Sequence, residues 1–264
     1  MPLDVLFEIF SYLLPYDMLN LSRTSKPFRN LLMDRNSVSF WKAARCNVPG
    51  LPEPFPGMSE PVFANLCYSP HCHVCLKSNV QDVIWDLRIR LCNICKKTST
   101  VSISVAKSRL YLKESKRLLP HISTYLVKWN DQVTDDWVRG VQRLLISDMD
   151  DVEKAWVSLP ASKEGRDQFL KDEDRRFKDI EKHAEVCDNW SQNKKYDRSQ
   201  ELNEVRQEHL RTILRKLNEA GYGEDVTFSD KHRDVHGRDP ICYHPFVRQA
   251  KPLTDRIWQN RCPA

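Results

Sequence analysis

Glycine is scarce in this sequence, and the short motifs of several enzyme classes are missing. Only seven glycines occur among 264 residues. The sequence contains no G-x-G-x-x-G, no P-loop, no G-x-S-x-G and no H-E-x-x-H. Their absence excludes the usual phosphate cradles, the hydrolase nucleophile elbow and the zincin helix. A glycine-poor and highly charged chain more often binds another molecule than catalyses a reaction.

The sequence also lacks long apolar runs and blocks of like charge. No segment approaches the roughly 18 consecutive apolar residues of a membrane-spanning helix. The first residues do not follow the basic-then-apolar order of a signal peptide. The net charge is +5, with acidic residues mixed among the basic ones. Charge alone therefore does not indicate nucleic-acid or membrane binding.

Cysteine, by contrast, is frequent and clustered. Nine cysteines are present, and five of them fall between residues 67 and 95. This distribution fits a metal site in a reducing compartment, so we expect a cytoplasmic or nuclear location. Two Cys-x-x-Cys pairs, Cys72/Cys75 and Cys92/Cys95, are separated by 16 residues. This spacing is typical of zinc sites, and we predict one structural zinc ion bound by these four thiolates.

Residues beside the first pair leave the exact ligand set open. Cys67, His71 and His73 lie close to it in sequence, so either histidine could replace a cysteine, and Cys67 is either a ligand or a bystander. The cysteines could also be free thiols or form disulfides. Four cysteine ligands would leave no coordination position for water, which makes an all-cysteine site structural rather than catalytic.

Apolar and polar residues alternate between and after the two pairs. The alternation over residues 85–91 predicts a half-buried strand that leads into Cys92. A second alternation covers residues 101–105. Together they predict a small zinc-ribbon-like β hairpin.

The remainder of the chain is predicted to be mainly α-helical. Apolar residues recur at helical spacing over residues 2–45, where Asp17 is the expected N-cap of a second helix. Helices are also expected over residues 106–158. One starts at Thr134 and carries Leu144 and Leu145, and another begins near Asp148 and is ended by Pro160. Residues 47–66 contain five prolines and are predicted to form an extended linker.

One stretch between Ser162 and Ala220 contains no proline and a single glycine. It predicts one long charged helix or a pair of helices, ended by a left-handed cap at Gly221. Its alternating charges indicate either a solvated surface or a coiled-coil arm. Residues 222–264 look irregular apart from a short helix capped by Thr254. This last segment also holds polar residues that lack zinc spacing and are interpreted as loop surface, namely Asp230, His232, Asp234, His236, Cys242 and His244.

The N-terminal helices contain a distinctive order of residues. The opening Pro2-Leu3 is followed by an acidic residue and an apolar helix, and Asp17 starts the next one. The run LSRTSKPFRN and then Trp41 follow, and the whole pattern resembles an F-box. The Cys/His segment and the charged helical part that follow are similar to those of F-box proteins of mushroom-forming fungi. The predicted segments are therefore an F-box (1–46), a Pro-rich linker (47–66), a Cys-rich segment (67–105), a helical region (106–160), a long helix or helix pair (161–221) and a C-terminal segment (222–264).

The resemblance implies a non-catalytic adaptor. F-box helices bind the Skp-type linker subunit of an SCF (cullin–RING) ubiquitin ligase, and the remainder of the chain would hold an unknown protein substrate. Positions carried over from the family as linker-facing are Pro2, Leu3, Leu6, Ile9, Leu13, Leu19 and Leu21. Because core and interface positions are both apolar, each of these residues could equally be helix core.

Two other functions compete with the adaptor hypothesis. A zinc-dependent nucleic-acid-binding protein would use basic residues of the Cys-rich segment as phosphate contacts, namely Arg88, Arg90, Lys96 and Lys97. An enzyme with a zinc or cysteine centre would need an open ligand position or a reactive thiol with a nearby base. The adjacent pairs His73/Cys75 and His71/Cys72 are the candidates for such a thiol and base.

Overall fold

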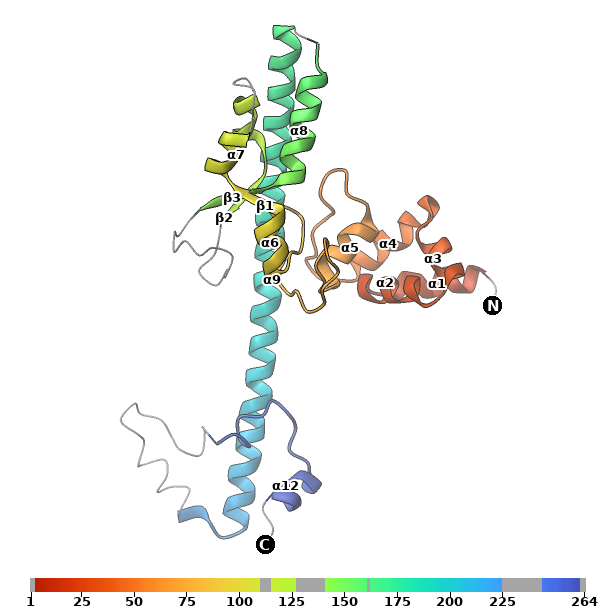
Figure 1. The fold of residues 1–264 in the computed structure, drawn as a ribbon. Helices are drawn as coiled ribbons and strands as arrows, with labels where there is room; N and C mark the ends of the chain where they lie inside the picture. Colours follow the sequence, from red (N-terminus) through yellow and green to blue (C-terminus); the bar gives the residue numbers. More distant parts are fainter. Residues whose placement is uncertain (1–2, 110–114, 127–140, 161, 225–243, 262–264) are drawn as a thin grey trace. The chain divides into compact units, whose positions relative to one another are not determined.

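The computed structural model of the chain describes residues 3–109, 115–126, 141–160, 162–224 and 244–261 (Figure 1). The mainly α-helical class predicted from the sequence is confirmed. The elements in chain order are α1 (Leu3–Tyr12), α2 (Pro15–Thr24), α3 (Lys26–Leu32), η1 (Arg35–Ser37), α4 (Val38–Cys46), α5 (Glu60–Tyr68), α6 (Asn93–Ser99), β1 (Thr100–Ser102), α7 (Ile103–Arg109), η2 (Ser115–His121), β2 (Thr124–Leu126), β3 (Gln142–Leu145), α8 (Ile146–Ser158), α9 (Lys163–Glu219) and α12 (Asp255–Arg261).

The first four α-helices pack around one small apolar core. Phe10, Met18, Leu32 and Trp41 are buried in it, and the Trp41 indole N–H donates a 2.7 Å hydrogen bond to the Leu32 carbonyl. Their burial explains why large apolar residues recur at helical spacing in this part of the sequence.

The start of α2 differs from the prediction in one respect. The helix begins at Pro15, which suits its first turn because proline has no N–H to leave unbonded. Asp17 is therefore not the N-cap. Its carboxylate instead accepts a 3.1 Å hydrogen bond from the backbone N–H of Leu14.

The segment predicted as an extended linker ends in a helix. Residues after Cys46 run without helix or strand up to Ser59, and α5 then begins at Glu60 with a proline in its first turn. Phe63 and Leu66 of α5 are buried together with Leu51 and Phe55 from the extended part. A first-turn proline favours a helix start and not a linker, which is why the proline count misled the prediction for residues 60–66.

The cysteine-rich segment contains a much shorter hairpin than the alternating pattern predicted. Ile84 and Ile89 form an isolated antiparallel bridge, with backbone N–H to O distances of 2.9 and 3.2 Å in the two directions. The strand predicted over residues 85–91 is wrong, because Trp85 to Arg88 form the turn of this hairpin. The alternation arises because Trp85 and Leu87 are buried in two different cores rather than on one face of a strand.

A three-stranded antiparallel sheet in the order β1-β3-β2 follows. The expected strand over residues 101–105 is shortened to β1, and α7 begins at Ile103. The strand β3 replaces part of the helix predicted from Thr134, whose first residues lie outside the described residues. Leu144 and Leu145 are buried in separate cores. A strand that is covered on both faces buries adjacent residues, which sequence periodicity cannot distinguish from a buried helix.

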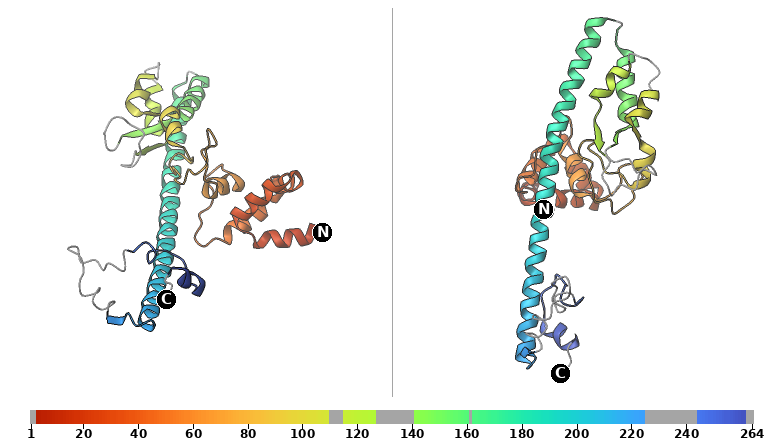
Figure 2. Two further views of the ribbon diagram at one scale, coloured as in Figure 1. Left: turned by 60° about the horizontal axis from the view of Figure 1, so that its bottom comes forward. Right: turned by 90° about the vertical axis from the view of Figure 1, so that its left-hand side faces the viewer.

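The helices α8 and α9 lie side by side over the first part of α9, as both views in Figure 2 show. Trp156 of α8 is buried, and Phe169 and Leu170 of α9 pack against its core. The entry of α8 near Asp148 and its end before Pro160 were predicted correctly. Residues 163–219 form a single helix rather than a pair, whereas the coiled-coil arm stays a prediction.

The chain divides into two compact units, residues 1–190 and 191–264, and α9 contributes to both. In the second unit, α9 ends at the predicted glycine: Gly221 has φ +94°, and the Tyr222 N–H donates to the Leu217 carbonyl at 3.0 Å. The predicted short terminal helix is α12, whose Ile257 N–H donates to the Thr254 hydroxyl. Of the six polar residues interpreted as loop surface, His244 is described and exposed, while the other five lie outside the described residues.

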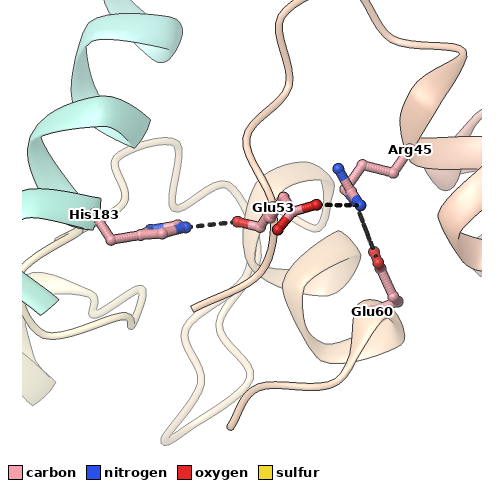
Figure 3. Close-up of polar contacts among 4 residues, drawn as sticks. All are labelled: Arg45, Glu53, Glu60 and His183. Carbon is pink, nitrogen blue, oxygen red and sulfur yellow. Dashed lines mark hydrogen bonds and ion pairs between the residues drawn. The ribbon is translucent and has the colours of Figure 1, made fainter. Parts of the chain in front are cut away.

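A buried ion pair joins the helices α4 and α5 (Figure 3). The Arg45 guanidinium Nε lies 3.2 and 3.1 Å from the two carboxylate oxygens of Glu60. Glu53 is a second, looser partner at 3.5 Å, and its backbone carbonyl is hydrogen-bonded to the His183 ring at 2.6 Å. These contacts connect the first four helices to α5 and to the first part of α9.

We expect Glu60→Gln to destabilise this region by about 3 kcal/mol, because it leaves the largely buried Arg45 guanidinium with only the exposed carboxylate of Glu53 as an ionic partner among the described residues. Glu60 is 7% exposed and Glu53 is 84% exposed. Glu53→Gln is therefore the matched control and should cost less than about 1 kcal/mol. Urea-induced unfolding of both variants measures the difference. Equal effects of the two substitutions would contradict a structural role for the buried pair.

Candidate metal centre and partner-binding surface

Two tight turns present the four cysteines. In the first, the Cys72 N–H donates to the Lys77 carbonyl at 2.8 Å, and the Leu76 N–H donates to the Cys72 carbonyl at 2.9 Å. In the second, Cys92 directly precedes α6, and Cys95 lies in the first turn of that helix. Each turn therefore directs two sulfur atoms toward the same point.

The sulfur atoms of Cys72, Cys75, Cys92 and Cys95 all lie within 4.8 Å of one another. The sulfurs of Cys75 and Cys92 are 3.6 Å apart. Four sulfurs around a tetrahedral zinc ion, with Zn–S bonds of about 2.3 Å, stand about 3.8 Å apart. All four cysteines are free thiols, so the set fits a metal ion rather than two disulfides.

The surroundings of the sulfur atoms lower the pKa of some of the four thiols and raise the pKa of another. Burial opposes ionisation of the Cys72 thiol, but backbone N–H groups of Cys75, Cys92 and Val74 outweigh it and lower its pKa to about 6. The Cys95 N–H similarly lowers the pKa of Cys92. Burial and the neighbouring thiols raise the pKa of Cys95. A bound dication would favour the thiolate form of all four.

The three alternative ligands lie outside this cluster. Among the described Cys, His, Asp and Glu side chains, the group close enough to share one metal ion consists of the four cysteines. Cys67, His71 and His73 do not belong to it. Burial, followed by Cys187, raises the pKa of Cys67. Burial, together with His71 and Arg90, lowers the pKa of His73 to about 4. The His73 Nε2 atom is buried and has no hydrogen-bond partner among the described residues, so it does not activate Cys75 as a base.

Two of the four basic residues proposed as phosphate contacts, Arg88 and Arg90, have internal partners, whereas Lys97 is exposed. Arg90 is buried, and its guanidinium donates to the carbonyls of Leu66, Cys67, Val80 and Gln81. Arg88 lies 3.6 Å from the Asp148 carboxylate. The guanidinium of Arg90 is therefore not available to a nucleic-acid backbone. It bonds the end of α5 to the loop at Val80 and Gln81, while the Arg90 carbonyl accepts from the His73 N–H in the first cysteine turn.

The residues predicted to face the linker differ in how far their side chains are exposed. Leu19 is 3% exposed and belongs to the core. Leu6, Leu13 and Leu21 are half-buried against that core, whereas Ile9 is 43% exposed. Leu3 lies in α1, although its side chain and all of Pro2 lie outside the described residues.

The helix α1 also exposes apolar residues that sequence reasoning missed. Val5 and Tyr12 are exposed, and they flank Ile9 at the i, i+4 and i+7 spacing that places three side chains on one helix face. Leu14 and Tyr16 add exposed apolar surface at the start of α2. A helical wheel of α1 could have separated this face from the one that contains Phe10.

A Cys–His pair outside the cluster was also missed. The sulfur of Cys187 lies 3.3 Å from the His183 ring nitrogen, one helical turn away. Cys187 is fully buried, and this burial raises its pKa to about 12. The thiol therefore stays protonated at neutral pH and acts as core rather than as a nucleophile.

Comparison with known families identifies the N-terminal helices. A family model described as F-box-like matches residues 1–44, so the chain carries an F-box-like domain at α1–α4. No curated protein and no solved structure matches the chain. Among the described helices, none combines the length and the apolar character that crossing a membrane requires.

We predict that purified protein binds one zinc ion per chain and that Cys92→Ser abolishes this binding, because three thiolates and a hydroxyl form a weaker site. Cys46→Ser is the matched control, since Cys46 is exposed at the end of α4 and should leave metal content unchanged. Elemental analysis after removal of loosely bound metal measures both variants. A metal content that is the same for the two variants would rule out the four-cysteine site.

Metal affinity should fall as the pH is lowered. Protons compete with the metal for thiolates. Cys72, whose pKa is lowered to about 6, is ionised above that pH. Cys95, with its raised pKa, must release a proton on binding at neutral pH. Competition titrations with a chelator at pH 6 and pH 8 should show weaker binding at pH 6, after correction for protonation of the chelator.

Proposed function

We propose that this chain is a substrate-receptor subunit of an SCF (cullin–RING) ubiquitin ligase, which uses its F-box-like domain to bind the Skp-type linker. The match to the F-box-like family over residues 1–44 carries this proposal. F-box domains bind such linkers and typically serve as non-catalytic adaptors. The chain would then act by proximity, since a substrate held near the charged ubiquitin-transfer enzyme reacts at a raised effective concentration.

The exposed face of α1 supports the linker contact. Val5, Ile9 and Tyr12 point away from the core that holds Phe10 and Trp41. Contiguous apolar surface of this kind often marks a binding site. Of the residues carried over from the family, Ile9 lies on this face, and the half-buried Leu6 and Leu13 border the core beneath it.

The four cysteines would hold zinc as a structural ion. Soft thiolates select zinc over hard cations, and four of them leave no position for a substrate. Metal binding would stabilise the two cysteine turns directly. Arg90 bonds to the first cysteine turn through its carbonyl and to the end of α5 through its guanidinium, and α5 packs on the F-box-like core through Ala64. The ion would therefore also stiffen the join between the linker-binding and substrate-binding parts. The clustered cysteines of the sequence are the basis on which we also propose a cytoplasmic or nuclear location.

The test is co-purification with the Skp-type linker of the source organism. Val5→Asp combined with Ile9→Asp should weaken the complex at least about tenfold, because two carboxylates would be buried in an apolar interface. Both side chains are exposed in the free protein, so folding should be preserved. The half-buried Leu6 and Leu13 are less suitable, since charging them would also disturb the core.

Val157→Asp is the matched control, because Val157 is equally apolar and exposed but lies on α8. It should bind the linker as the wild type does, and circular dichroism should show all variants folded. If folded wild-type protein forms no complex with the linker, the adaptor function is wrong.

A further inference from the structure

The two cysteine turns carry exposed aliphatic side chains at their tips. Val74 lies between Cys72 and Cys75 and is 54% exposed, and Leu76 directly after this pair is 71% exposed. Ile94 occupies the position in the second pair that Val74 occupies in the first, and it is 68% exposed. The two turns that carry these side chains meet at the four sulfurs, which lie within 4.8 Å of one another.

The backbone at Leu76 is unfavourable for its side chain. Leu76 has φ +60°, in the left-handed region where glycine is accommodated without steric cost and a bulky residue is not. Leu76 stands inside the turn that the hydrogen bond from the Cys72 N–H to the Lys77 carbonyl closes. The chain therefore keeps an exposed leucine where glycine would fold more readily, and such strain is found where a side chain has a binding role.

Positive charge lies directly beside these side chains. Lys77 follows Leu76 and is exposed, and Lys97 is exposed one helical turn after Ile94, on the same side of α6. The aliphatic side chains are thus flanked by two ammonium groups from two different turns. A partner complementary to this surface would offer aliphatic side chains next to carboxylates.

We propose that Val74, Leu76 and Ile94, with Lys77 and Lys97, form a docking surface for a protein segment in which aliphatic residues are flanked by aspartate or glutamate. The inference rests on the proposed adaptor function in that the segment would belong to the substrate. The linker would bind elsewhere, at the exposed face of α1. The zinc ion would hold the two turns at the spacing the segment requires.

A random peptide library displayed on phage, selected against the zinc-loaded full chain, tests this surface without knowledge of the substrate. The selected peptides should combine Leu, Ile, Val or Met with Asp or Glu. Fluorescence anisotropy of one labelled peptide should show affinity that falls with added salt, because the lysine–carboxylate contacts are exposed. Leu76→Gly should weaken this binding about tenfold or more, the effect of removing an anchoring side chain.

Leu76→Gly is informative because it suits the backbone and should retain the zinc content and melting temperature of the wild type. If it loses zinc, Val74→Ser provides the same test without altering the backbone at residue 76. Val157→Ser, which removes an exposed valine from α8, is the matched control and should bind the peptide normally. Affinity for the peptide that is unchanged in both Leu76→Gly and Val74→Ser would overturn the proposal.

Other outcomes would overturn it as well. These are selection of no peptide, selection of peptides without acidic residues, and binding to phosphatidylserine vesicles in place of any peptide. The linker experiment separates this proposal from the adaptor function. The Val5→Asp, Ile9→Asp variant should still bind the peptide, and Leu76→Gly should still bind the linker. Peptide binding by a chain that forms no linker complex would leave the docking surface intact and reject the adaptor function alone.

Discussion

The buried residue Arg90 is the contact on which the arrangement of α5 and the cysteine-rich segment depends. Its guanidinium donates to carbonyls at the end of α5 and in the loop at Val80 and Gln81. The Arg90 carbonyl in turn accepts a 2.9 Å hydrogen bond from the His73 N–H. One residue thus joins α5, the loop and the first cysteine turn. Lysine could not replace it, because an ammonium lacks the planar fork that reaches several carbonyls at once.

The F-box-like helices depend on the residues that follow them. The family match ends at residue 44, but the core of α1–α4 also contains Ala64 and contacts Tyr68, both from α5. The buried Arg45–Glu60 pair lies at the same junction. The helix α5 thus contributes to two cores, because Phe63 and Leu66 on its other side are buried in the next core. It thereby couples the two cores mechanically. Some forty residues would bury too little apolar surface alone, which is a physical reason for this arrangement.

Local signals predicted the parts of the fold that depend on local chemistry. The helices of the first core, the end of α8 before Pro160, the cap at Gly221 and the convergence of the four cysteines all follow from spacing and turn chemistry. The errors lie where burial depends on distant partners. Trp85 and Leu87 alternate because each enters a different core, and the adjacent Leu144 and Leu145 are buried on a two-sided strand. Prediction from hydrophobic periodicity assumes that an element has one buried face, and it therefore fails at both places.

The electrostatics of the four thiols explain why the cysteine turns and their exposed tips should act as one metal-dependent unit. Backbone N–H groups lower the pKa of Cys72 and Cys92, whereas burial and neighbouring thiols raise that of Cys95. A second or third thiolate in so small a space is opposed by the charge of the first, so the four cannot all ionise without a cation. The strained turn at Leu76 is an additional cost that the free turn would relieve by opening. A dication that neutralised the thiolates would remove the repulsion and hold this backbone closed, so a fixed arrangement of Val74, Leu76 and Ile94 would depend on bound metal.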